Sequence, residues 1–367
     1  MLRGRQLVKA RKIVSKKAFN SFIEELAERT KVVAPVERED GAFSFEEVRD
    51  ASTLRAHYIP SAGSAKKYFF PPEEVLLRFR SSADDGVHAG GDVQVTAEVE
   101  SEDMVLLGVR PCDVAAINLM DRVFADTYED ENYLEKRARA TVIGVNCLSP
   151  CDEHAFCAAM GSLDVTGGYD LMLTDLDDSW VIDVATDAGE KLLGECEGLR
   201  ELRPEESERL QRVLSGRERD FEGARNRLDF PAEEIPQVLA EGEESPVWDE
   251  YGARCLGCGR CNLVCPTCFC FDVQDDVSLD LGEGERRRRW DACTLQDFAL
   301  VACGENFRAD RSERLRHMYY HKGKYAHERY GQLYCTGCGR CVRTCLMNID
   351  PPTVYNEVRR RPSGEAE

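Results

Sequence analysis

The alternation of apolar and polar residues along the chain predicts an amino-terminal domain that mixes helices with strands. Amphipathic spacing predicts a helix over residues 17–28. Short apolar runs predict strands over residues 104–109, 141–145, 171–174 and 180–184. Residues 114–139 lie between the first two strands and have a helical pattern, with Asp113 in position to cap it. We therefore expect residues 1–186 to form a mixed α/β domain.

The remainder of the chain changes character twice. Residues 187–247 are acidic and rich in helix formers, and they end in Glu-Gly-Glu-Glu-Ser-Pro-Val, which predicts a helical connector and then a domain boundary. Cysteines crowd residues 248–358, where residues 308–330 have a helical pattern. We expect this second domain to be mainly α-helical, and the whole chain to be of the α+β class. Residues 359–367 are expected to form a frayed tail.

Composition and charge indicate a globular protein and argue against membrane-spanning and nucleic-acid-binding classes. The chain has 367 residues, and 43% of them are hydrophobic, which is enough for a sizeable core. No apolar run approaches the ~20 residues of a membrane helix, and the basic start does not resemble a secretory signal. A formal net charge of −20 argues against binding to nucleic-acid phosphates. We expect a cytoplasmic protein with no membrane span and no nucleic-acid partner.

A seven-residue motif, Cys-x-Gly-Cys-Gly-Arg-Cys, occurs twice, at residues 255–261 and 335–341, and each copy is followed four residues later by another cysteine. This is the ligand spacing of a two-cluster iron-sulfur protein, in which each run lends its fourth cysteine to the other cluster. The spacing predicts two 4Fe-4S sites. The first would be held by Cys255, Cys258, Cys261 and Cys345, and the second by Cys335, Cys338, Cys341 and Cys265.

The residues between these cysteines support the same chemistry. Glycines at positions 257, 259, 337 and 339 allow tight turns that direct backbone N–H groups at sulfur. Zinc is the alternative, but a tetrahedral zinc site is usually built from separated Cys-x-x-Cys pairs. Seventeen cysteines in a large chain without a secretory signal also indicate a reducing compartment rather than a disulfide framework.

A second group of cysteines follows two of the predicted strands. Cys112 and Cys147 come just after neighbouring strands, and Cys151 and Cys157 follow in the next loop. The carboxyl ends of parallel strands share one edge of a sheet, so these four thiols are expected to converge on a third 4Fe-4S cluster. His154 could replace one of them. The alternative is that some of the four are ordinary buried thiols.

The remaining cysteines and the basic run have less specific interpretations. Cys268, Cys270 and Cys293 could bind a further metal, exchange redox equivalents or pack around the cluster ligands, and we favour packing. Cys196 and Cys303 are isolated and are expected to be inert. The run from Arg286 to Arg289 could be a docking patch, but ion pairs with this acidic chain are the preferred interpretation.

Several motifs of enzymes are missing from the sequence. It has no Gly-x-Gly-x-x-Gly after a strand and no Gly-x4-Gly-Lys-Ser/Thr, so it is not expected to hold a dinucleotide or to hydrolyse a nucleotide. No Ser/His/Asp arrangement can be recognised among the six scattered histidines. We expect no catalytic centre in this chain, and a partner that supplies electrons.

The joint pattern of motifs resembles the β subunit of soluble nickel-iron sulfhydrogenases, a family that includes the A subunit of anaerobic sulfite reductase. The motifs are Gly-Val-Arg-Pro-Cys-Asp (108–113), Asn-Cys (146–147), Ala-Phe-Cys-Ala-Ala-Met-Gly (155–161), Cys-Pro-Thr-Cys-Phe-Cys (265–270), Trp-Asp-Ala-Cys (290–293) and Glu-Asn-Phe-Arg (305–308). The resemblance implies an electron relay between a subunit that oxidises NAD(P)H at a flavin and a subunit that bears the catalytic metal, either nickel-iron or sirohaem.

The leading hypothesis is therefore an electron-transfer subunit of an oxidoreductase complex in anaerobic metabolism, with no catalytic residues of its own. The hydrogenase and sulfite reductase versions share these motifs, so the sequence does not distinguish between the two kinds of catalytic partner. Two hypotheses come from other classes. One is a metal-binding scaffold that transfers no electrons. The other is a self-contained reductase that acts on a small molecule at the amino-terminal cluster.

Overall fold

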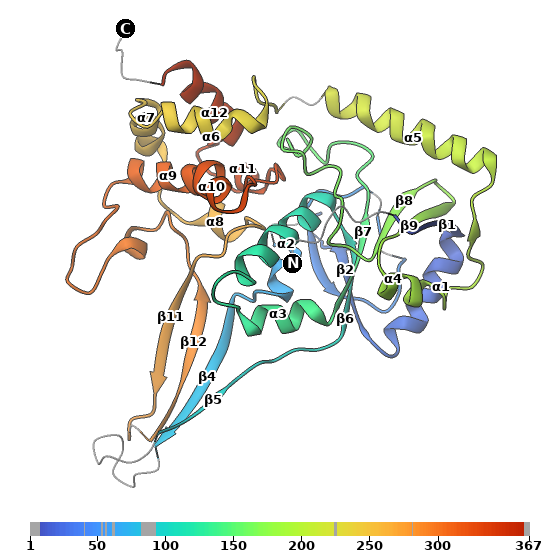
Figure 1. The fold of residues 1–367 in the computed structure, drawn as a ribbon, viewed down its shortest axis with the longest axis horizontal. Helices are drawn as coiled ribbons and strands as arrows, with labels where there is room; N and C mark the ends of the chain where they lie inside the picture. The colour runs from blue at the N-terminus through green and yellow to red at the C-terminus, as the bar shows by residue number, and fades with distance from the viewer. Residues whose placement is uncertain are drawn as a thin grey trace.

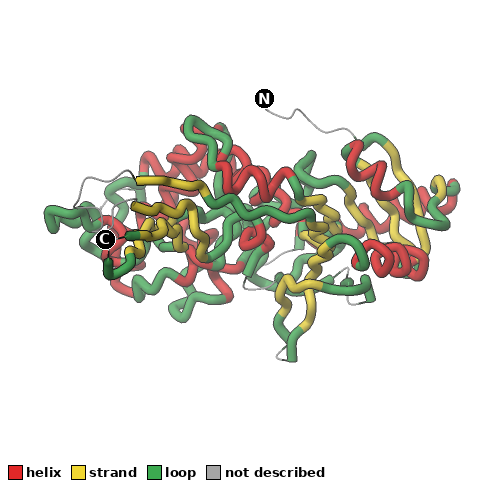
Figure 2. Tube along the Cα trace, turned by 90° about the horizontal axis from the view of Figure 1, so that it is seen from below, coloured by secondary structure: helices red, strands yellow, loops and turns green. Residues whose placement is uncertain are grey.

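The computed structural model describes residues 8–362 except 40, 53, 56, 61–62, 82–92, 224–225 and 281. The first seven residues of the basic start and residues 363–367 of the expected tail lie outside the described residues. The molecule is elongated, with a large sheet toward one end and a helical region toward the other (Figure 1 and Figure 2). No helix in the described part of the chain has the length and apolar character needed to cross a membrane.

The large sheet has eight strands in the order β10-β1-β9-β8-β7-β6-β2-β3. They are β1 (Ala10–Ser15), β2 (Lys31–Glu37), β3 (Phe43–Glu47), β6 (Met104–Val109), β7 (Ala140–Val145), β8 (Leu171–Asp175), β9 (Ser179–Val184) and β10 (Arg200–Glu201). Strands β2, β6, β7 and β8 are parallel, and the strands toward both edges are antiparallel. The predicted apolar strands are confirmed and form the centre of this sheet.

Helices bury both faces of the large sheet. They are α1 (Lys16–Ala27), α2 (Pro111–Phe124), α3 (Glu131–Ala138) and α4 (Asp187–Leu193). All six residues of β6 are buried, and they alternate between the two faces: Leu107 packs in the core with α1, whereas Leu106 packs in the core with α2 and α3. This double burial explains why β6 reads as a continuous apolar run.

The predicted helix over residues 114–139 is wrong in two respects. It is two helices, and the first begins at Pro111 with Arg110 as its N-cap. Proline suits the first position of a helix because it has no N–H to leave unsatisfied. Asp113 therefore lies inside the first turn and does not cap the helix; its carboxylate instead pairs with Arg340.

The carboxyl-terminal region is mainly helical, as predicted, and the α+β class is confirmed. Its helices are α6 (Ile235–Glu241), α7 (Val247–Arg254), α8 (Arg260–Leu263), α9 (Arg311–Tyr320), the π-helix η5 (His321–Tyr325), α10 (Ala326–Tyr330), α11 (Arg340–Arg343) and α12 (Pro351–Arg360). Residues of α6, α7, α9 and α12 share one apolar core. The helix α5 (Pro204–Glu222) connects the two regions (Figure 1).

A second sheet, which the sequence pattern did not reveal, joins the two regions. Its order is β11-β12-β4-β5, and all its pairings are antiparallel. Strands β4 (Glu73–Ser81) and β5 (Val93–Ala97) come from the amino-terminal region, whereas β11 (Phe271–Val277) and β12 (Glu283–Trp290) come from between the two cysteine runs. The sheet extends away from the helices (Figure 1). The two regions thus share backbone hydrogen bonds.

The arginine run lies on β12, and the ion-pair interpretation is confirmed. Arg286 pairs with Asp275 on β11, and Arg287 and Arg289 both pair with Glu73 on β4. Arg288 points inward, is 2% exposed, and contacts both Glu74 and Asp130. A buried cation is tolerated only when carboxylates surround it, so Arg288 fixes the hairpin against the amino-terminal region.

A loop of the amino-terminal domain packs tightly against the second cysteine run. The Phe156 N–H donates to the Gly337 carbonyl at 2.9 Å. A Cβ atom on Gly337 would lie 2.7 Å from the backbone of Cys157, and one on Gly339 would lie 2.7 Å from the His154 carbonyl oxygen. These contacts require glycine in the second run for close packing as well as for turn formation.

We predict that Gly337→Ala destabilises the protein and that Gly331→Ala does so much less. Both glycines have a positive φ, but no atom lies within 4 Å of a Cβ built on Gly331. The free energy of unfolding of the Gly331 variant should therefore fall by only about 1 kcal/mol, the cost of a positive φ for alanine. The Gly337 variant must also move a backbone, so its urea midpoint should fall clearly further. Equal midpoints for the two variants would contradict the packing described here.

Candidate metal centres

The structure brings the first cysteine run together with the last cysteine of the second run. Cys255 follows α7, and Cys261 lies in α8. Cys258 and Cys345 are both among the charged neighbours that act on the Cys255 and Cys261 thiols. Burial is the largest effect on Cys261 and raises its pKa to about 12. The Gly257 N–H points at the Cys255 sulfur at 3.4 Å, as expected around a thiolate ligand.

The second run is completed by the last cysteine of the first. Cys265 and Cys338 are both electrostatic neighbours of the Cys335 and Cys341 thiols. Gly337 and Gly339 have φ values of +65° and +73°, which few other residues adopt. The fold thus brings Cys265 beside the second run and Cys345 beside the first. Burial raises the pKa of Cys335 to about 12, so a metal must displace protons there.

The amino-terminal cysteines also converge. Cys112 lies in the first turn of α2 just after β6, and Cys147 lies just after β7, which pairs with β6 in parallel. Cys112, Cys147 and Cys157 share one small buried cluster and are 4%, 4% and 5% exposed. Cys151 is less buried, and its thiol has Cys147 as an electrostatic neighbour. The four thiols thus gather at the edge of the sheet where parallel strands end.

The amino-terminal set and the second run meet at a shared residue. Cys338 packs in the same buried cluster as Cys112 and Cys157, and its charge acts on both of their thiols. Cys265 is in turn an electrostatic neighbour of Cys261 in the first set. The three sets therefore form an unbroken series through the protein: first run, second run, amino-terminal set.

Buried cations surround the amino-terminal set. The Arg110 guanidinium is 1% exposed and donates to the Cys147 sulfur at 3.5 Å and to the Tyr58 carbonyl at 2.8 Å. Arg340 makes two hydrogen bonds of 2.7 Å to the Asp113 carboxylate. Burial raises the pKa of Cys147, and Arg110 opposes that rise. Fixed positive charge next to buried thiols suits an anionic metal-thiolate group.

His154 is not part of this set in the structure. Its ring lies 3.9 Å from the Glu153 carboxylate, and its backbone carbonyl accepts a hydrogen bond from Asn226. The side chain is 36% exposed, unlike the buried thiols. The sequence proximity that suggested a ligand role reflects only its position in the loop.

Two lysines that no motif indicated flank the turn after the first run. Buried Lys66 donates to the carbonyl oxygens of Cys265 and Cys268 at 3.1 and 2.9 Å. Lys322, in the π-helix, donates to the Thr267 hydroxyl at 3.0 Å, and Cys265 is a charged neighbour of its ammonium. Burial would lower the pKa of Lys322, but the thiols of Cys265 and its neighbours raise it well above its ordinary value. A π-helix commonly marks a functional position.

The other cysteines separate into two kinds. Cys268, Cys270 and Cys293 lie beside the ferredoxin-type sets, and Asn262 donates to the sulfurs of Cys268 and Cys293 at 3.6 and 3.2 Å. Cys196 is buried in the core of the large sheet, and Cys303 is exposed. Among the described side chains, no three histidine, cysteine or acidic residues close on one metal ion. A cubane is bound at four separate corners, so its ligands lie farther apart than those of a single ion.

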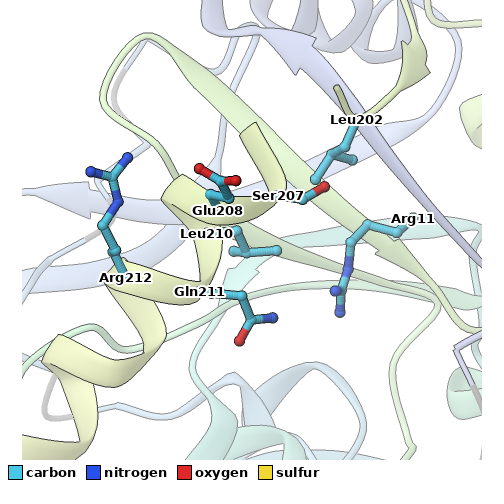
Figure 3. Close-up of a pocket in the computed structure, with 7 residues that line it drawn as sticks. All are labelled: Arg11, Leu202, Ser207, Glu208, Leu210, Gln211 and Arg212. Carbon is cyan, nitrogen blue, oxygen red and sulfur yellow. The ribbon is translucent and has the colours of Figure 1, made fainter. Parts of the chain in front are cut away.

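A surface hollow of about 530 Å³ lies between Arg11 of β1 and the start of α5 (Figure 3). Leu202, Ser207, Glu208, Leu210, Gln211 and Arg212 line the rest of it, and Figure 3 shows them as a mixture of apolar and polar side chains. Arg11 is already paired with Asp183. No cysteine lines this hollow, so it is separate from the thiol sets.

Comparisons with known proteins agree with this arrangement. Residues 254–349 match a family model described as a 4Fe-4S dicluster domain. Over 342 residues the chain is 31% identical to sulfhydrogenase 2 subunit beta of Pyrococcus furiosus, which covers 93% of this chain and 96% of that relative. No solved structure matches the chain. The resemblance identified from the motifs is confirmed: the chain belongs to the sulfhydrogenase β-subunit family, with a 4Fe-4S dicluster domain in its carboxyl-terminal region.

Proposed function

We propose that this chain is the iron-sulfur electron-transfer subunit of a cytoplasmic oxidoreductase complex of the nickel-iron sulfhydrogenase type. The observation that carries the proposal is the unbroken series of three thiol sets, in which Cys338 packs against Cys112 and Cys157. Bound 4Fe-4S clusters would supply one-electron transfer at each set. The eight ferredoxin-type cysteines would hold two clusters, and Cys112, Cys147, Cys151 and Cys157 a third.

The protein's own residues hold the three sets in fixed relation and control their surroundings. The Asp113–Arg340 ion pair ties the amino-terminal set to the second run, and both side chains are 1% exposed. Arg110 and Lys322 place positive charge beside thiols of two different sets. Burial of Cys112, Cys147, Cys157 and Cys338 excludes water where two of the sets meet, which strengthens these electrostatic effects there.

The first set is the least buried and supports a docking surface for a partner. Cys258 is exposed, and Leu256 and Leu346, which adjoin ligands of this set, are 51% and 66% exposed. Apolar side chains at the surface beside a redox site suit contact with another subunit. We propose that a subunit oxidising NAD(P)H at a flavin and a catalytic metal subunit contact opposite ends of the series.

We predict that anaerobically purified protein contains about twelve iron atoms per chain and that Cys157→Ser retains about eight. Dithionite reduction followed by electron paramagnetic resonance should show one reducible centre fewer in the variant. Cys196→Ser is the matched control, because Cys196 is buried in the core of the large sheet. Equal iron content in wild type and Cys157→Ser would contradict the assignment of a third cluster to the amino-terminal cysteines. Zinc without any reducible signal would support the non-conducting scaffold.

We predict that a nickel-containing subunit and a flavin-containing subunit co-purify with this chain when it is purified anaerobically from its native host. The catalytic metal distinguishes the two family versions: sirohaem in place of nickel would make the complex a sulfite reductase. Turnover of a small substrate by the isolated chain would instead support the self-contained reductase.

We predict that Lys322→Met lowers the midpoint potential of the centre bound by the second run. Loss of one charge-assisted contact is worth about 1.5–3 kcal/mol, and 1.4 kcal/mol corresponds to about 59 mV for one electron, so the negative shift should be about 60–130 mV. Lys324→Met is the control, since that ammonium lies over the Tyr320 ring. A redox titration in which both variants match wild type would show that Lys322 does not tune this centre.

A further inference from the structure

Cys270 and Cys293 are held together by the hairpin that joins the two regions. Cys270 directly precedes β11, and Cys293 comes three residues after β12 ends. The strands pair Phe271 with Trp290, and the Asp291 N–H donates to the Cys270 carbonyl at 2.9 Å. Two thiols 23 positions apart in sequence therefore lie side by side at the base of the hairpin.

The two thiols affect each other in opposite directions. Cys293 lowers the pKa of the Cys270 thiol, and Cys270 raises the pKa of the Cys293 thiol well above its ordinary value. The Asn262 amide donates to the Cys293 sulfur at 3.2 Å and is itself oriented by the Thr294 hydroxyl at 2.7 Å. Cys293 is the largest cause that lowers the pKa of Cys270, to about 7, whereas Asn262 donates to Cys293 within this pair. Cys270 is thus the better nucleophile and Cys293 its proton-bearing neighbour.

Exposure assigns the same roles independently. Cys270 is partly exposed, whereas Cys293 is 6% exposed and lies in the apolar core of the helical region. An external reagent can reach only Cys270 directly. Cys293 can then react only with a group that Cys270 already carries, which is the arrangement of an attacking and a resolving thiol.

We propose that Cys270 and Cys293 form a thiol-disulfide exchange site that reacts with low-molecular-weight disulfides. In the first step the Cys270 thiolate attacks one sulfur of the disulfide RSSR, and RS⁻ leaves. In the second step the Cys293 sulfur attacks the Cys270 sulfur, its proton passes to solvent, and a second RS⁻ leaves. The two cysteines lose two electrons, and the external disulfide is reduced to two RSH.

The product would cross-link the base of the hairpin. That cross-link spans the segment whose β12 strand pairs with β4 of the amino-terminal region. The reaction also removes the proton of the Cys293 thiol and leaves Asn262 facing a disulfide sulfur. The site would therefore report the thiol-disulfide balance of its surroundings at the joint between the two regions, whether or not the chain carries electrons.

The test uses the full-length protein, purified anaerobically and incubated with oxidised glutathione. N-ethylmaleimide is present during denaturation, so that thiols released from ligand sets are blocked before they can exchange. Peptide mass spectrometry should then find Cys270 disulfide-linked to Cys293 in wild type. Cys293→Ser should stop at a glutathione adduct on Cys270, and Cys270→Ser should give neither product. Cys268→Ser is the matched control and should still form the linkage.

Three results would overturn the proposal. One is wild-type protein in which both residues are recovered as maleimide adducts after incubation. Another is a linkage of Cys268 to Cys270 or Cys293 in place of the assigned pair. The third is a loss of iron from Cys270→Ser relative to Cys268→Ser, which would make Cys270 a metal ligand. Iron content and the unfolding midpoint, measured on each variant, show that the serine substitutions leave the fold intact.

Discussion

The buried ion pair between Asp113 and Arg340 is the interaction on which the arrangement of the two halves depends. Asp113 adjoins Cys112, and Arg340 adjoins Cys341, so the pair links a thiol of the amino-terminal set to a thiol of the second run. Removing two charges from water costs several kcal/mol per ion, and only close bidentate contact offsets that cost. If the two halves shifted relative to each other, both charges would lose their partner. The ion pair therefore specifies one relative position of the two halves.

The same setting explains how an acidic chain can favour anionic centres. The net charge is −20, yet the charged groups that act on the thiols include Arg110, Arg340 and Lys322. Local cations, rather than the overall charge, determine the potential at a buried site because the low dielectric of the interior strengthens short-range effects. Acidic residues such as Asp275 and Glu73 form ion pairs with arginines at the surface.

The sequence predicted whatever depends on local spacing. The two cysteine runs could be assigned because their ligand geometry is set within eleven residues, and β6 and β7 could be assigned because double burial leaves an apolar run. The role of Arg340 could not be predicted, because the same motif places Arg260 at the equivalent position and Arg260 is exposed. Only the second copy faces the amino-terminal domain. β12 was missed because its arginines pair with carboxylates from β11 and from distant β4 and Asp130.

The pairing of β12 with β4 also constrains how the chain reaches its fold. Arg288 and Glu74 are 214 positions apart, so their contact has a very long loop to close. Contacts of such separation form slowly, and β4 has no β12 partner until most of the polypeptide has been synthesised. Until then one edge of β4 offers unpaired backbone groups to other chains. During synthesis the acidic residues beside that edge, Glu73 and Glu74, would keep nascent chains apart by mutual repulsion.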